Sequence, residues 1–90
     1  MNEIKKMAMA GTVESSDILI TVAPAQAGTG IEIELNSPVL KQYGRQIKAV
    51  IAEVLAAHQV TDALINASDK GALDCTIKAR LTTALARAGE

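Results

Sequence analysis

The sequence predicts an α+β fold, a two-layer sandwich in which two helices cover a mostly antiparallel sheet, with the elements in the order β-β-β-α-β-α. Two observations predict this fold. Apolar residues alternate with polar ones in part of the first third of the chain and recur every three or four residues in two later segments. Aromatic residues make up 1% of the chain although 49% of it is hydrophobic, and small aliphatic side chains pack well between a sheet and helices. A chain of 90 residues can bury one modest core, so we expect a single domain over residues 1–90.

Three β-like segments come first. Met7–Val13 predicts a short strand, weakened by its small residues. Ile18–Val22 is rich in β-branched residues, and Pro24 ends it. Ile31–Leu35 alternates apolar and acidic residues, which directs its three apolar side chains to the core and its two glutamates to water. A sheet with one wet face favours antiparallel pairing.

The first predicted helix spans Ser37–His58. Ser37 can serve as its N-cap, and Pro38 suits the first helical position, where a missing N–H costs nothing. Gly44 should cost about 1 kcal/mol relative to alanine unless something packs closely there. Spacings of three and four residues predict one buried stripe, formed by Val39, Leu40, Tyr43, Ile47, Val50, Ile51, Val54 and Leu55.

The last third predicts one more strand and one more helix. Val60–Ala67 is β-like, and the polar run Ser68–Gly71 ends it. Asp69 or Ser68 is expected to cap the helix that follows, with Gly71 allowing a tight entry. Asp74 in the first turn and Arg87 in the last suit the helix dipole. The expected core residues of this helix stand at four-residue spacing: Leu73, Ile77, Leu81 and Leu85.

The composition excludes several classes of protein. A net charge of −1 is unlike a nucleic-acid binder, which needs many Lys and Arg residues. The near absence of aromatic residues removes the stacking platforms of single-strand binders. No apolar run approaches the roughly 20 residues of a membrane helix. The single cysteine, Cys75, cannot form an internal disulfide, and we expect a reducing, cytoplasmic location.

The chain also lacks the residue clusters that catalysis or metal binding needs. His58 is the only histidine, and we interpret it as a helix-end residue. Cys75 is interpreted as a small, at least half-buried hydrophobic residue. We therefore expect no catalytic residue and no metal site. A covalent carrier needs only one hydroxyl on an exposed, firmly based loop, and Ser15 and Ser16, in the short polar segment Glu14–Asp17, meet that description.

Two segments resemble the signatures of one family. Ala10–Asp17 resembles the prosthetic-group attachment motif of the acyl carrier subunit (gamma chain) of citrate lyase. Asp69–Cys75, followed by Ala79–Leu81, resembles the second signature of that family, and the resemblance extends over residues 9–88. Ser68 is a departure, because the family has an acidic residue there.

The resemblance implies a specific function. In that family a serine carries 2'-(5''-phosphoribosyl)-3'-dephospho-CoA through a phosphodiester, and the matching position is Ser15, with Ser16 as second choice. The thiol of this group holds an acetyl thioester. The alpha subunit (acyl transferase) exchanges acetyl for citrate, and the beta subunit (acyl lyase) releases oxaloacetate. A prosthetic-group transferase loads the serine, and the chain itself catalyses neither step.

Some alternatives stay open at this stage. The carrier subunits of malonate decarboxylase and citramalate lyase use similar groups. The chain could also be an unmodified interaction module, or a small hydrolase using Ser15 with His58. For a carrier, Glu14 and Asp17 would repel a phosphate-bearing arm, so we expect them to help dock the transferase or the catalytic subunits through basic surfaces. Asp69–Cys75 is interpreted as structural in preference to a contact with the arm or a partner.

Overall fold

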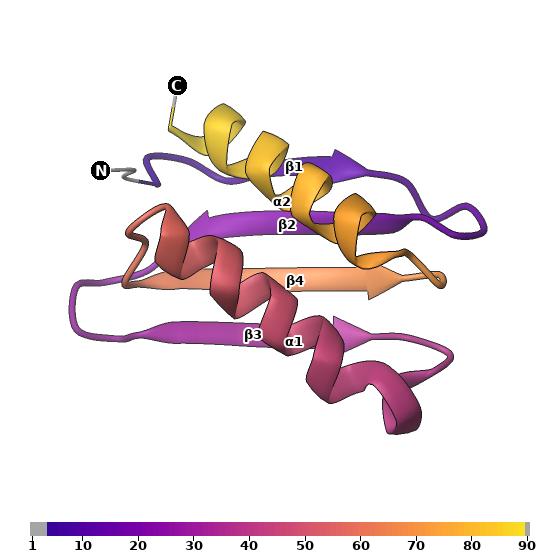
Figure 1. Ribbon diagram of the computed structural model, residues 1–90. Helices are drawn as coiled ribbons and strands as arrows, with labels where there is room; N and C mark the ends of the chain where they lie inside the picture. Colours follow the sequence, from indigo (N-terminus) through magenta and orange to yellow (C-terminus); the bar gives the residue numbers. More distant parts are fainter. Residues whose placement is uncertain (1–3, 90) are drawn as a thin grey trace.

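The computed structural model describes residues 4–89. Within this range the elements are, in order, β1 (Ala8–Gly11), β2 (Ile18–Pro24), β3 (Ile31–Asn36), α1 (Leu40–Ala57), β4 (Ala63–Asp69) and α2 (Asp74–Ala88). Both helices lie on the same face of one sheet (Figure 1). The predicted two-layer sandwich and its element order are confirmed.

The sheet has the strand order β1-β2-β4-β3. β2 pairs antiparallel with β1 and with β4, whereas β3 pairs parallel with β4. The parallel pair follows from the path of the chain, because α1 carries it from the end of β3 back to the start of β4. The loop before β2 therefore lies at the same end of the sheet as the end of β4 and the start of α2 (Figure 1).

The core lies between the sheet and the two helices. Ile18, Ile20 and Val22 are fully buried along β2, and their alternation with less buried residues gives this strand a helix-facing side. α2 adds Ile77 and Leu81, which are also fully buried. Each such side chain contributes about 1.5–3 kcal/mol to folding, so the end of β2 nearest the serines is firmly anchored.

Helix α1 begins later than predicted, at Leu40. The Ser37 hydroxyl accepts a hydrogen bond from the Val39 N–H (3.2 Å) and donates one to the Asp69 carboxylate (2.8 Å), so it orders the preceding loop and does not cap the helix. Leu40 and Tyr43 were expected in the buried stripe, but they are 45% and 53% exposed. The first turn of α1 lies at the edge of the sheet, beyond β3, where little can cover it (Figure 1).

Gly44 and β3 show how α1 meets the sheet edge. Gly44 is buried, and a Cβ placed there would lie 3.0 Å from the side chain of Leu40 in the preceding turn of the same helix. Ile33 and Leu35 are half-buried against the core, as predicted. Ile31 was also expected to face the core, but it is 36% exposed because it opens an edge strand.

Candidate functional site

The two serines lie in a tight turn. The Asp17 N–H donates to the Glu14 carbonyl (3.1 Å), which closes a β-turn over these four residues. Ser16 has φ 65, whereas Ser15 is not among the residues with positive φ. That combination is typical of a type II turn, in which Ser15 takes the first central position. The sequence prediction of a turn over Glu14–Asp17 is confirmed.

The turn is fixed to the rest of the sheet by a β-bulge. The Ser16 N–H donates to the Lys70 carbonyl (2.8 Å), and the Lys70 N–H donates to the Asp17 carbonyl (2.9 Å). Two residues on the β2 side thus oppose one residue on the β4 side. The positive φ of Ser16 is the conformation that glycine usually supplies in such a bulge. The backbone beside Ser15 is therefore held by residues far away in sequence.

Asp17 is the main anchor of this turn. Its carboxylate accepts two hydrogen bonds from Arg80 of α2, from Nε (3.0 Å) and Nη2 (2.9 Å). It also accepts from the Thr12 hydroxyl (2.6 Å) and from the Ile18 N–H (2.7 Å). These bonds, those of Arg80 above all, hold the pKa of Asp17 well below its ordinary value of 3.8. Its acceptor sites are directed at the chain itself, and this argues against the docking role predicted for Asp17.

Gly11 is needed where β1 meets the turn. Its φ is +103, and a Cβ there would lie 1.8 Å from the Ile18 carbonyl oxygen. A side chain would collide with backbone that cannot move away. Gly11 therefore gives the backbone a path into the turn that a residue with a side chain could not take.

The segment of the second signature, Asp69–Cys75, helps to hold the turn of the first signature in place. Asp69 is buried, and its carboxylate accepts hydrogen bonds from the Ser37 hydroxyl (2.8 Å) and the Ala72 N–H (2.9 Å). This fixes the segment that includes Lys70, whose backbone in turn holds Ser16. With Arg80, the segment acts as the base of the turn. The sequence shows both motifs, but it gives no signal that they are in contact.

Several expectations for this segment are wrong. Neither Asp69 nor Ser68 caps α2, because the N-cap position is Leu73 and no side chain bonds there. Leu73 is 69% exposed instead of anchoring the core, since it precedes the first helical turn. Cys75 is exposed and free, so it does not pack as a hydrophobic residue. The expected charges are in place, with Asp74 in the first turn of α2 and Arg87 in the last.

Both serine side chains are accessible. Ser15 and Ser16 are exposed, and neither hydroxyl is hydrogen-bonded to any residue within the range 4–89. Glu14 is also exposed. The turn therefore presents two hydroxyls to solvent on a backbone that β4 and α2 hold in place.

The hydrolase alternative fails on position. His58 is the C-cap residue of α1, which ends near the start of β4, whereas Ser15 lies before β2 at the other end of the sheet (Figure 1). β2 alone spans seven residues, or about 23 Å at the usual rise of a strand. A nucleophile needs its base within hydrogen-bond reach.

The described residues include neither a metal-binding cluster nor a membrane-spanning helix. In that part of the chain, no three His, Cys, Asp or Glu side chains are placed to hold a metal ion. The helices of residues 4–89 are also too short or too polar to span a membrane. The exposed hydroxyls of Ser15 and Ser16, in what we call the serine turn (Glu14–Asp17), remain the candidate site.

Comparison with known proteins identifies the family. Residues 5–88 match the family model described as malonate decarboxylase delta subunit (MdcD). A citrate lyase acyl carrier protein of Oenococcus oeni is 55% identical over 86 residues, which is 96% of this chain and 87% of that protein. The corresponding protein of Latilactobacillus sakei is 53% identical over 85 residues, or 94% of this chain and 82% of the relative. The one of Cronobacter sakazakii is 53% identical over 88 residues, covering 98% and 89%.

The fold also has a solved counterpart. A chain in the crystal structure of a Pseudomonas malonate decarboxylase hetero-tetramer in complex with malonate superimposes with a TM-score of 0.82, covering 99% of this chain and 93% of that one. At 20% identity this likeness shows the fold alone. The relatives and the family model together show that the chain belongs to the citrate lyase acyl carrier protein family, whose members are carrier subunits and not catalytic ones.

Proposed function

We propose that the chain carries 2'-(5''-phosphoribosyl)-3'-dephospho-CoA through a phosphodiester on the Ser15 Oγ, and that it serves the alpha and beta subunits of citrate lyase. One observation carries the proposal: an exposed hydroxyl, free of hydrogen bonds to the described residues, at the corner of a turn that two distant segments, around Lys70 and Arg80, hold in place. A transferase needs access to the hydroxyl, and a tethered arm needs a firm base. Ser15 offers both.

The two serines contribute differently to the turn. Ser16 has the positive φ and donates its N–H to Lys70, so its backbone is part of the scaffold. Ser15 occupies the corner and makes no comparable backbone contact outside the turn. A bulky group on Ser15 therefore disturbs nothing that holds the turn, which supports the preference for Ser15 over Ser16.

The chain's chemical part in loading is that of a nucleophile. The Ser15 oxygen would attack a phosphorus atom of an activated nucleotide donor, its proton would go to a base of the transferase, and the leaving group would depart with the electrons of the broken P–O bond. Asp17 is not free to assist as a base, because Arg80 engages its carboxylate. When bound, the group supplies a thiol for acyl transfer.

Within the turn, Glu14 is the acidic residue left for docking. Glu14 is exposed, whereas the Asp17 carboxylate is hydrogen-bonded to Arg80 within the chain. We therefore keep the docking hypothesis for Glu14 and assign Asp17 a positioning part. The proposal includes a cytoplasmic location, since a reducing compartment keeps the exposed Cys75 thiol free.

Replacing Ser15 tests the proposal directly. The chain is co-produced with the attachment enzymes, and the peptide covering residues 10–17 is analysed by mass spectrometry. We expect the unaltered peptide to gain the mass of the prosthetic group, Ser15→Ala to gain none, and the matched control Ser16→Ala to be loaded. Loading of Ser15→Ala but not of Ser16→Ala would move the site to Ser16, and an unaltered peptide without added mass would refute the carrier proposal.

A further inference from the structure

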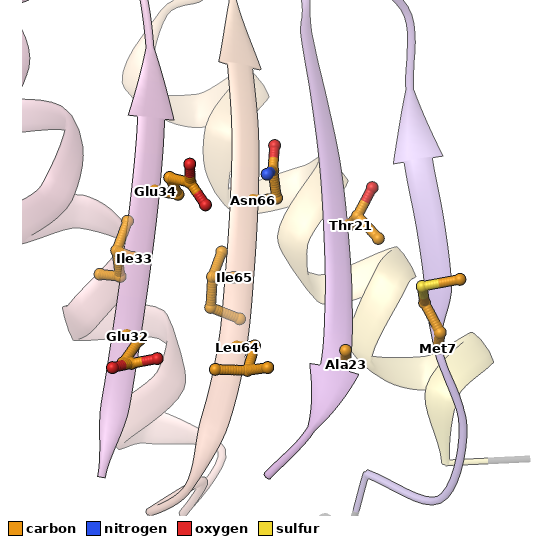
Figure 2. A pocket seen from close by; sticks show the side chains of 9 residues that line it. All are labelled: Met7, Thr21, Ala23, Glu32, Ile33, Glu34, Leu64, Ile65 and Asn66. Atoms are coloured by element: carbon orange, nitrogen blue, oxygen red, sulfur yellow. The ribbon is translucent and has the colours of Figure 1, made fainter. Parts of the chain in front are cut away.

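The face of the sheet turned away from the helices carries a shallow hollow (Figure 2). The strand register places its residues in rows that cross the sheet. In one row Glu32 lies beside Leu64, and Leu64 beside Ala23, with Met7 just before β1. The next row is formed by Glu34, Asn66, Thr21 and Met9. The hollow has a volume of about 790 Å³.

This face is more apolar than a sheet surface that meets only water. The wet side of an antiparallel sheet usually presents polar side chains. Here Met7 is 64% exposed, Met9 50% and Leu64 40%. Such a concentration of exposed apolar side chains typically marks a contact surface, and methionine adapts well to a partner's shape.

The charge of the face says what kind of partner fits. Glu32 and Glu34 are both exposed at the β3 edge, and the residues that line the hollow include no Lys or Arg. Neither glutamate forms an ion pair with a residue in the range 4–89, unlike Asp17 and Glu53. Two copies of this face would bring four carboxylates together without a cation from the hollow. A surface with Lys or Arg side chains opposite β3 is complementary.

The position of the hollow suits a carrier. Its apolar row, at Ala23 and Leu64, lies where β2 ends and β4 begins. The serine turn lies at the opposite end of β2, roughly 20 Å away at the usual rise of a strand. A partner seated on this face leaves the turn free to approach other surfaces.

We propose that the sheet face that residues 4–89 leave uncovered, centred on Glu32, Glu34, Leu64 and Met7, binds a catalytic subunit of the complex that presents basic side chains opposite β3 and apolar side chains opposite β1. The proposal rests on the carrier role only for the identity of the partner. Binding through this face does not require a modified Ser15, so the two proposals fail separately.

Charge reversal tests the acidic edge. The affinity of the full chain for each purified catalytic subunit is measured with and without the attachment enzymes during production. We expect Glu32→Lys with Glu34→Lys to weaken binding about tenfold at low salt and less at high salt. The control Glu53→Lys alters an exposed carboxylate on α1 and should have little effect. Equal effects of the two variants, or none from the double variant, would overturn the proposal.

An apolar pair of variants tests the other half of the surface. Leu64→Gln should weaken binding at every salt concentration, whereas Leu73→Gln, which alters a more exposed leucine off the sheet, should not. Circular dichroism verifies that each variant is folded, and the mass of peptide 10–17 verifies normal loading. Variants that load normally but bind weakly support the surface. Self-association of the chain through this face, abolished by Leu64→Gln, would assign it to a second copy instead and refute our proposal.

Discussion

In each of the two loops that flank β2, an aspartate carboxylate accepts a hydrogen bond from a backbone N–H. The loops differ in the kind of residue that adopts a positive φ. In the β2–β3 loop, Gly28 and Gly30 supply the positive φ angles in open space, and the Asp62 carboxylate accepts from the Gly30 N–H (2.7 Å). In the serine turn, the positive φ falls on Ser16, and Lys70 and Arg80 hold the backbone around it.

The difference shows that the conformation of one loop follows from its own glycines, whereas the conformation of the other depends on tertiary contacts. A glycine-rich loop adopts its path with little help, because glycine has no Cβ to strain. A serine at positive φ costs about 1 kcal/mol or more, which the tertiary contacts must offset. The contacts with Lys70 and Arg80 that offset this cost exist only in the folded domain, so the shape of the serine turn depends on the fold.

The largest expected effect comes from adding a methyl group at a glycine beside each loop. Gly11→Ala should lower the free energy of unfolding by about 3 kcal/mol or more, because its Cβ would collide with the Ile18 carbonyl. Gly28→Ala has a similar φ but open space, and should cost about 1 kcal/mol. Urea unfolding of both variants measures this, and equal losses would show that φ alone decides.

A pH titration compares the two aspartates. The pKa values of Asp17 and Asp62 are both lowered in the folded chain, by hydrogen bonds from Arg80 and from the Gly30 N–H respectively. Each therefore stabilises the fold above its ordinary pKa, and this contribution is lost as pH falls through the lowered value. The free energy of unfolding should fall less below about pH 4 in Asp17→Asn than in the unaltered chain. The effect of Asp62→Asn should be smaller, because of the two aspartates only Asp17 has an arginine partner.

Thermal unfolding between about pH 2 and pH 7 detects this difference, since both pKa shifts act in the acid range. Arg80→Gln should reduce the loss of stability at acid pH as Asp17→Asn does, because it removes the principal cause of the lowered Asp17 pKa. If both variants lose stability at acid pH as steeply as the unaltered chain, Asp17 does not anchor the turn.

The smallest expected effect separates the two serines. Ser16→Gly removes the strain of a positive φ, so stability should stay the same or rise by up to about 1 kcal/mol. Ser15→Gly, at a position without positive φ, should lower it by about 0.5 kcal/mol through the added freedom of the unfolded chain. Urea unfolding resolves the sign, and a lower stability of Ser16→Gly would contradict the bulge assignment.

Periodicity was enough to predict most of the fold. The alternation in Ile31–Leu35 and the four-residue spacing of Ile77, Leu81 and Leu85 identified the strand and the helix that the structure contains. The ends of elements were less predictable. Ser37 has the properties of an N-cap, but a buried carboxylate from β4 takes its hydroxyl, and no local pattern shows such a competitor.

In the candidate site, too, some features follow from the sequence and others only from the tertiary structure. The sequence by itself determined which chemistry is available: two hydroxyls in a polar turn, and no second histidine or cysteine to build a catalytic or metal centre. Only the tertiary structure decided what supports the turn and which acidic side chain stays free, because Asp17 meets Arg80 across 63 positions of sequence. Periodicity and local propensity describe neighbours along the chain, whereas a contact of this kind exists only once the sheet and α2 have packed.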